Sequence, residues 1–260
     1  MKKLVLQSVV CIFVSLLLLT SCIEEGGNVQ DKQAFGIVRF DYETGKNVLD
    51  VTNDDITIYS SRFQNDFDDN CFFVTYRIDY DDEQNSAKNV EAREYWNVSV
   101  YDHMPASRNY LASTIDTSNV LPNEVPLEDA FVGMEGYIRY FKGKLFMFST
   151  LRIPEDQKMD WHMSYDKDNM LSEEYGQRYY NLFLRSTIRV EETGSKVLVG
   201  IPNAFEIKRF FEEAAQKEKE LGGSSFSLRF NYPTAIGEDG QITWGHQDML
   251  DVLRIEEVLE

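Results

Sequence analysis

The sequence predicts an all-β fold, and two observations carry that prediction. Polar and apolar residues alternate with period two in several runs, most clearly at residues 72–80, 182–190 and 226–232. Such alternation is typical of strands in antiparallel sheets, where one face is buried and the other meets water. A single segment, residues 203–221, has the spacing of an amphipathic helix instead. We therefore expect antiparallel sheets accompanied by one helix.

The chain begins with a segment typical of exported lipoproteins. Lys2 and Lys3 precede an apolar run over residues 4–19, and two small residues lead to Cys22. The alternative is a permanent membrane helix, but the run is shorter than the ~20 apolar residues that a span needs, and acidic residues follow it. We therefore predict a signal peptide over residues 1–21. Its ending resembles a bacterial lipobox, in which the cysteine is acylated.

Residues 22–34 are predicted to form an acidic and polar tether. Glu24 and Glu25 resemble the acidic tags that direct such lipoproteins to the outer face of the outer membrane, although a merely solvated linker is the alternative. Two or more acyl chains hold a protein stably on a membrane. We therefore predict a lipid-anchored protein of the outer membrane, exposed at the cell surface.

The net charge of the chain limits the kinds of partner that we expect it to bind. The formal net charge is −18, and loss of Lys2 and Lys3 with the signal peptide makes the mature chain more acidic still. A surface of this sign repels phosphate backbones and anionic headgroups, so we expect no nucleic-acid partner. Because Cys11 leaves with the signal peptide and Cys22 is acylated, Cys71 is left alone and no intrachain disulfide is expected.

The strand-like runs fall into two groups. A turn-rich stretch with three prolines predicts a linker over residues 104–126, between residues 35–103 and residues 127–260. Residues 145–153 are apolar on both faces, which indicates a central strand covered on two sides. Weaker runs of alternation occur at residues 36–42, 56–60, 96–100, 134–141, 160–165 and 196–201.

The helical segment covers residues 203–221. Asn203 is placed to cap its start and Gly222 to end it, while Glu213 and Lys217 are spaced for an ion pair. We expect the helix to pack over an open end or a face of a sheet through its apolar stripe, which consists of Ile207, Phe210, Phe211 and Ala214.

The chain resembles the NigD-like lipoproteins of gram-negative gut and oral anaerobes. The resemblance is carried by the lipobox at Cys22 and by strand and aromatic patterns at residues 36–38, 71–79, 95–100, 145–154, 162–166 and 180–185. It implies an OB-like small barrel over residues 35–103, followed by an antiparallel β-sandwich over residues 127–260. The family's biochemical role is not established, so the resemblance implies no catalytic residues.

Familiar catalytic and metal-binding patterns do not occur. His162, Ser164 and Asp166 share one strand face, but successive members would stand ~6–7 Å apart, too far for a nucleophile and its base. The histidines lack partners at ligand spacing, and H-E-x-x-H, C-x-x-C, G-x-G-x-x-G and P-loop motifs are absent. We therefore expect no cofactor and no metal.

Acidic clusters offer one further candidate site. Hard oxygen ligands suit calcium, but the run from Asp79 has Gln84 where an EF-hand loop needs glycine. Asp-rich turns at strand ends are usually only hydrogen-bonded and solvated. Adventitious calcium therefore stays an open alternative at the two clusters, Asp66, Asp68 and Asp69, and Asp79, Asp81, Asp82 and Glu83.

Aromatic residues give the remaining lead. Tyr179, Phe183, Arg185 and Arg189 fall on the outer face of one predicted strand. Aromatic rings beside arginines can stack on sugars or anchor a protein. The alternative is that a second layer, such as the helix, covers them.

Three functions remain open. We favour a non-catalytic surface lipoprotein that serves as a binding or assembly module for a glycan or a protein. The second is a structural envelope subunit without a small ligand. The third is a glycan-acting hydrolase whose paired carboxylates, among residues 66–82 or at Glu135, meet only in the fold.

Overall fold

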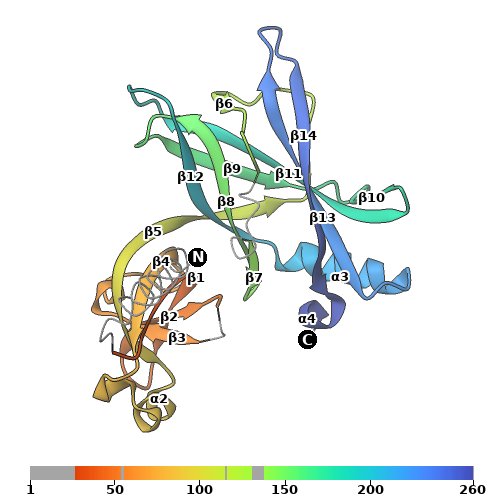
Figure 1. Ribbon diagram of the computed structural model, residues 1–260. Coiled ribbons are helices and arrows are strands. Elements are labelled where there is room, and N and C mark those ends of the chain that lie inside the picture. The colour runs from red at the N-terminus through yellow and green to blue at the C-terminus, as the bar shows by residue number, and fades with distance from the viewer. Residues whose placement is uncertain (1–26, 54–55, 115, 131–137, 260) are drawn as a thin grey trace, which may run out of the picture.

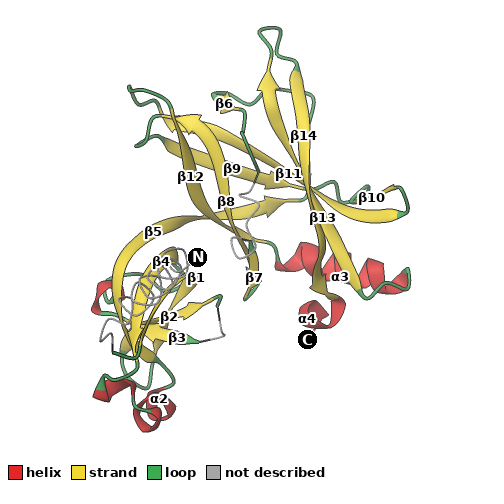
Figure 2. Cartoon of the chain, in the orientation of Figure 1, coloured by secondary structure: helices red, strands yellow, loops and turns green. Residues whose placement is uncertain are grey.

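The structure is a computed structural model that describes residues 27–53, 56–114, 116–130 and 138–259. Two β-rich domains are joined by one long strand, β5 (Trp96–Ala112), which curves from the first domain into the second (Figure 1). Strands dominate the chain (Figure 2). The predicted all-β class, with a small barrel followed by a sandwich, is confirmed.

The N-terminal domain is a five-stranded barrel. Its strands pair in a closed ring, in the order β1–β2–β3–β5–β4–β1, with the β3–β5 pair parallel. Ring closure with this order is the OB arrangement. The strands of the ring other than β5 are β1 (Val29–Asp41), β2 (Lys46–Val51), β3 (Thr57–Tyr59) and β4 (Cys71–Asp79). Short helices interrupt its loops, namely η1 (Ser61–Phe63), η2 (Glu83–Asn85) and α2 (Ala87–Arg93).

Alternation along the strands fills the barrel. Every second residue of β4 points inward, as the sequence predicts, because these side chains share one face of the strand. Gly36 in β1 allows the barrel to close tightly, since a Cβ there would lie 2.6 Å from Cγ of Leu49. The inward residues form one cluster with members such as Phe72, Val74, Tyr76 and Ile78.

The C-terminal domain is a sandwich of two sheets. Their inner faces enclose the largest apolar cluster of the described residues, and the end is closed by a helix, α3 (Lys208–Glu220). One sheet contains β7 (Arg139–Phe141), β8 (Lys144–Ile153) and β12 (Val197–Glu206). The other contains β6 (Glu124–Val125), β9 (Lys158–Ser164), β10 (Leu171–Glu174), β11 (Gln177–Val190), β13 (Ser225–Ile236) and β14 (Ile242–Arg254).

The sandwich departs from purely antiparallel pairing. β11 and β13 are parallel, and β5 runs parallel to both β9 and β12. Parallel neighbours need a long crossover. Between β11 and β13 the chain supplies one by passing through β12 and α3. A short helix, α4 (Ile255–Leu259), follows β14 and packs beside α3.

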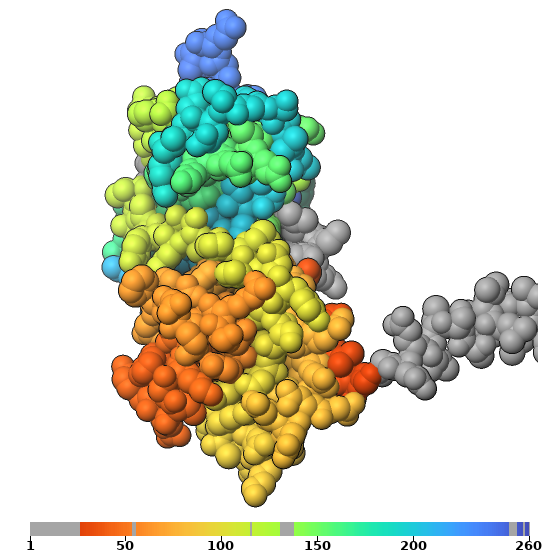
Figure 3. All heavy atoms as spheres, turned by 90° about the vertical axis from the view of Figure 1, so that its left-hand side faces the viewer, coloured from red at the N-terminus to blue at the C-terminus, as the bar shows by residue number. Residues whose placement is uncertain are grey.

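β8 is buried on both faces, as the sequence predicts. Leu145 and Met147 point into the sandwich core, whereas Phe146 and Phe148 join a second cluster with Phe35 of the barrel. The second cover is therefore the N-terminal domain itself, and the two domains stack closely (Figure 3).

The segment predicted as a linker contains regular structure. Residues 104–112 form the second half of β5, pairing first with β4, then with β12 and β9. Pro105 ends no strand here, because it lies within β5 opposite Phe72. The turn-rich pattern predicts a break, but strand partners in both domains keep the backbone extended.

The helix begins later than predicted. Asn203 lies buried in β12, paired with Met147 and Ser107, so it cannot cap the helix. The backbone N–H groups of Ile207 and Lys208 instead donate to the carbonyl of Gly143. Sheet pairing on both sides of β12 outweighs the local helical pattern at residues 203–206.

Of the other details of the helix prediction, two are confirmed and one is not. Gly222, at φ +79°, follows the last turn as predicted. Glu213 accepts hydrogen bonds from Arg209 and Tyr165, whereas the expected pair with Lys217 is not among the ion pairs of the described residues. The apolar stripe packs into the sandwich core.

Part of the segment predicted as a tether, residues 22–34, forms regular structure. Residues 29–34 already belong to β1 and pair with β4, where Asp31 accepts two hydrogen bonds from Arg77. Cys22, Glu24, Glu25 and Glu135 lie outside the described residues. Among the described residues, no helix has the length and apolar character needed to cross a bilayer.

Candidate functional site

The histidine, serine and aspartate noted in the sequence do not form a catalytic group. His162 Nε2 lies 3.1 Å from the hydroxyl of Thr187 on β11. Asp166 lies beyond the end of β9 and accepts backbone N–H groups of the following turn. These contacts hold a strand and a turn, as expected for the solvent-facing side of a sheet.

The acidic clusters are occupied by their own turns and ion pairs. Asp68 accepts the N–H of Phe40, Asp69 pairs with Arg108 and Lys144, and Asp82 caps η2. Within the part of the chain that the structure describes, no three His, Cys, Asp or Glu side chains gather closely enough to hold a metal ion. These clusters therefore serve the local fold.

The face of an OB barrel that commonly binds ligands, on β2 and β3, is partly engaged here by the protein's own side chains. Asp50 on this face is 4% exposed and is held by Thr57, by Arg39 and by Lys142 of the second domain. Lys46 stacks over Tyr59. The barrel thus uses part of this surface for internal contacts.

One sheet of the second domain has a polar and aromatic outer face. Along β11, Tyr180, Leu182 and Leu184 are buried in the sandwich core, so Tyr179 and Phe183 point to the other side. Helix α3 packs on the core side, where Phe211 contacts Phe226 and Glu218 accepts a hydrogen bond from the hydroxyl of Tyr180. The alternative that this helix covers Tyr179 and Phe183 is therefore wrong.

Strand register arranges the outer side chains in rows. We call this surface the outer sheet face, and its first two rows cross β11, β13 and β14. The first row is Asn181, Arg229 and Asp248, and the second is Phe183, Asn231 and His246; the third is Pro233 and Trp244, with Arg185 of β11 beside Trp244. Tyr179 lies next to the first row, and β10 borders it with Ser172 and Glu174.

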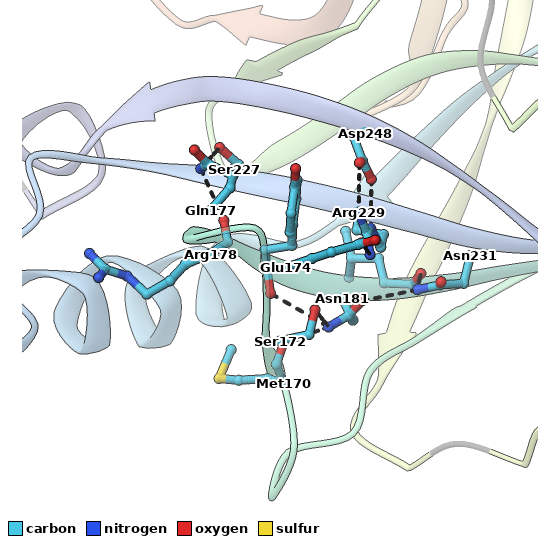
Figure 4. Close-up of polar contacts among 12 residues, drawn as sticks. Met170, Ser172, Glu174, Gln177, Arg178, Asn181, Ser227, Arg229, Asn231 and Asp248 are labelled. Atoms are coloured by element: carbon cyan, nitrogen blue, oxygen red, sulfur yellow. Dashed lines mark hydrogen bonds and ion pairs between the residues drawn. The ribbon is translucent and has the colours of Figure 1, made fainter.

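Arg229 is clamped at the centre of the first row. It donates to Asp248 through two nitrogens, at 2.7 and 2.8 Å, and to Glu174 at 2.7 Å (Figure 4). Its guanidinium lies 4.1 Å from the ring centroid of Tyr179. The hydrogen bonds to Asp248, with those to Glu174, raise the pKa of Arg229 above its ordinary value. The arginine is therefore rigid and permanently charged.

Two asparagines connect neighbouring strands. Asn231 donates to the side-chain oxygen of Asn181 at 3.3 Å and to the carbonyl of Leu182. Asn181 in turn donates to Ser172 at 2.9 Å, and Figure 4 shows these side chains converging between β10, β11 and β13. The amides are thus held in fixed orientations.

Arg185 closes the far end of the face. Its side chain is 6% exposed and pairs with the fully buried carboxylate of Glu124, while it also donates to the carbonyls of Asp116 and Asn119. Trp244 lies 5.8 Å from this guanidinium and meets Phe183 edge to face at 5.7 Å. Both rings remain half-buried.

Arg189 is not part of this face. It lies at the exposed end of β11 and pairs with Asp160 of β9. Of the four residues that the sequence indicated, Tyr179, Phe183 and Arg185 therefore lie together and Arg189 stands apart.

Several polar groups of the outer sheet face have no protein partner among the described residues. His246 is exposed, and neither its ring nitrogens nor the hydroxyl of Tyr179 nor the indole N–H of Trp244 makes a hydrogen bond there. These groups can meet a ligand without breaking an internal contact.

Sequence reasoning missed the contribution of β13 and β14. The alternation in residues 226–232 assigns Arg229 and Asn231 to a wet face, but nothing local says that this face continues that of β11. No regular alternation marks β14 in the sequence, because Gly245, His246, Gln247 and Asp248 interrupt its apolar residues. The register with β13 is what brings Trp244 and His246 to the face.

Comparison with known proteins agrees with the ring of five strands. Residues 26–104 match the lipoprotein OB domain. The N-terminal domain is therefore similar to lipoprotein OB domains. The match ends where β5 leaves the barrel, so it covers the N-terminal domain and not the sandwich.

Solved structures share the two-domain fold. One is an uncharacterised protein from Parabacteroides merdae, with 21% identity and a TM-score of 0.67, matched over 84% of this chain and 96% of that one. A candidate lipoprotein from Bacteroides fragilis has 11% identity and a TM-score of 0.56, over 84% and 97%. A NigD-like immunity protein from Bacteroides caccae is also similar, with 12% identity and a TM-score of 0.45, over 85% and 93%.

These likenesses show the fold alone. The match to the lipoprotein OB domain and the fold shared with the first two structures confirm the resemblance at the level of an N-terminal lipoprotein OB domain and of overall fold. No curated protein matches the sequence.

Proposed function

We propose that this protein is a non-catalytic lipoprotein, anchored in the outer membrane through acylated Cys22, that presents a ligand-binding surface outside the cell. The observation that carries the proposal is the outer sheet face. Half-buried aromatic rings lie there beside clamped arginines and asparagines, and no helix among the described residues covers them. Aromatic rings beside arginines are groups that anchor ligands on protein surfaces.

The anchor is supported from two directions. The signal segment ends in a lipobox-like sequence at Cys22, and the domain that follows matches a lipoprotein OB domain. The chain enters that barrel at Val29, so the OB domain is next to the tether and the outer sheet face belongs to the domain beyond it. A ligand outside the membrane would meet this second domain.

A hydrolase is less well supported by the same face. Its carboxylates Glu174 and Asp248 both hold Arg229 by ion pairs. A glycosidase needs one carboxyl group free to give up a proton. The pair is therefore better suited to hold the arginine than to act on a glycosidic bond.

Binding is tested with the mature chain from Cys22 onward, carrying Cys22→Ser to keep it unlipidated. A glycan array and a pull-down from envelope extracts should each be run beside the variant His246→Ala. Binding that the variant weakens supports the proposal. If nothing binds, or if the variant binds equally well, the structural-subunit alternative is favoured.

The anchor has its own test. Palmitate fed to cells producing the full-length chain should label the protein, and Cys22→Ala should abolish both the label and signal cleavage. Label that persists in Cys22→Ala would contradict the assignment of the lipid site.

A further inference from the structure

We propose that the ligand of the outer sheet face is an uncharged glycan chain. This inference rests on the proposed binding function and adds the chemical class of the ligand. Three features of the face support it: its charges, its polar groups without a hydrogen-bond partner among the described residues, and the spacing of its aromatic rings.

The charges on the face leave no cation for an acidic ligand. Arg229 is paired with Asp248 and Glu174, and Arg185 with Glu124, so two guanidinium groups meet three carboxylates. Arg185 has further donors engaged by backbone carbonyls. The chain as a whole carries a formal charge of −18. A uronate, sulfate or phosphate group would therefore be repelled here rather than recruited.

The open groups suit hydroxyls, which both donate and accept hydrogen bonds. The phenol of Tyr179 and the imidazole of His246 can do both, and the indole of Trp244 donates. Asn231 pairs with His246 across β13 and β14, and its amide nitrogen is already engaged by Asn181 and Leu182. Its oxygen is thereby turned into an acceptor of fixed orientation.

The aromatic rings provide apolar surface for the C–H faces of sugar rings. Phe183 and Trp244 form an edge-to-face pair in neighbouring rows. Tyr179 is four residues from Phe183 along β11, which corresponds to ~13 Å. A single sugar ring cannot bridge that length, so the spacing points to an oligosaccharide with separate residues on separate rows.

A protein ligand fits the face less well. The core of a protein–protein interface is depleted of charged residues and is more apolar than its rim. Here the centre is occupied by Arg229 with its two carboxylates and by two linked asparagines. The face alternates apolar rings with polar groups, as a sugar chain alternates C–H faces with hydroxyls. Because these side chains are already held in position, binding would cost little conformational entropy in the protein.

The experiment compares neutral and acidic glycans on the mature chain with Cys22→Ser. Matched sets of neutral oligosaccharides, from two sugar units upward, and of uronate-containing or sulfated ones are titrated by calorimetry. Trp244→Ala and His246→Ala alter the face, and Tyr42→Ala removes an 89% exposed ring on the barrel as the control. Circular dichroism of each variant checks that the fold is retained.

We expect neutral oligosaccharides to bind, with affinity rising with chain length. Trp244→Ala should weaken binding about tenfold or more, and His246→Ala severalfold. Tyr42→Ala should bind as the parent does. If Trp244→Ala fails to fold, loss of binding in the exposed variant His246→Ala carries the same conclusion.

Three results would overturn the inference. Preferential binding of acidic glycans through this face would refute the charge argument but leave the binding function standing. Capture of a protein through the same residues, without glycan binding, would refute the choice of a glycan as ligand but leave the binding function standing. Binding of neutral glycans that His246→Ala and Trp244→Ala leave unchanged would move the site elsewhere.

Discussion

Two surfaces of this molecule place aromatic rings on the outside of sheets, and they differ in what meets them. At the domain interface, Phe35 and Phe73 of the barrel pack against Phe146 and Phe148 of β8, with ring centroids 4.8–5.3 Å apart. On the outer sheet face, Phe183 and Trp244 meet each other edge to face, and Trp244 lies beside the guanidinium of Arg185. The first surface is closed by a second domain, whereas the second is left open.

The polar groups follow the same division. At the interface, Lys144 bridges Asp69 of the barrel and Glu206 of β12, and Arg108 pairs with the same two carboxylates. These ion pairs cross between domains and fix their relative position. On the outer sheet face, the ion pairs of Arg229 stay within one sheet and fix the shape of a surface. The comparison teaches that similar residues can serve stability in one place and recognition in another.

The largest expected effect tests the interface. Phe146→Ala removes a fully buried ring at the centre of the contact and should lower the free energy of unfolding by about 3–5 kcal/mol, measured in urea. Cys71, in the same cluster, is a second probe, because burial raises its thiol pKa to about 12 and slows labelling. Labelling should be faster in the variant. Unchanged stability and labelling would mean that the domains do not depend on this contact.

The second prediction concerns the cation between the domains. Lys144→Met keeps the length of the side chain but leaves two carboxylates with Arg108 alone, so we expect a loss of about 3 kcal/mol. Arg152→Met, at an exposed pair with Glu128, is the matched control and should change stability by about 0.5 kcal/mol or less. Equal effects of the two substitutions would contradict a special role for the interface.

The third prediction is a pH dependence. Burial alone would raise the pKa of Asp50, but hydrogen bonds from Lys142 and Thr57 outweigh it and bring the pKa below the ordinary value of 3.8. Its ionised form therefore stabilises the fold above that pH and loses this effect as the pH falls through the lower, folded-state pKa. Asp50→Asn should cost about 2 kcal/mol at pH 7 and progressively less below pH 4. A cost that does not shrink in acid would argue against the ionised carboxylate.

The smallest expected effect on stability belongs to the open face. His246→Ala should change the free energy of unfolding by about 0.5 kcal/mol or less, because the exposed imidazole has no partner among the described residues. The same substitution is expected to weaken ligand binding severalfold. A large loss of stability would instead show that His246 stabilises the fold, and would contradict the difference between the two surfaces.

Local pattern predicts the strands better than their ends or their partners. β4, β8, β9, β11 and β13 follow directly from alternation or from a two-sided apolar run. The helix start was misplaced at Asn203, because pairing of β12 on both edges keeps those residues extended. The turn-rich pattern around Pro105 likewise gave no sign that one strand continues through both domains.

By itself, the sequence determined the strand-rich class and the outward direction of Tyr179, Phe183 and Arg185, since period-two geometry needs no long-range information. The export signal before Cys22 is likewise a prediction from the sequence alone. Only the tertiary structure decided that this face stays open and what completes it. Arg229 meets Glu174 across 55 positions of sequence, and Asn231 meets Asn181 across 50. Those contacts depend on the parallel register of β11 and β13, which the crossover through β12 and α3 sets.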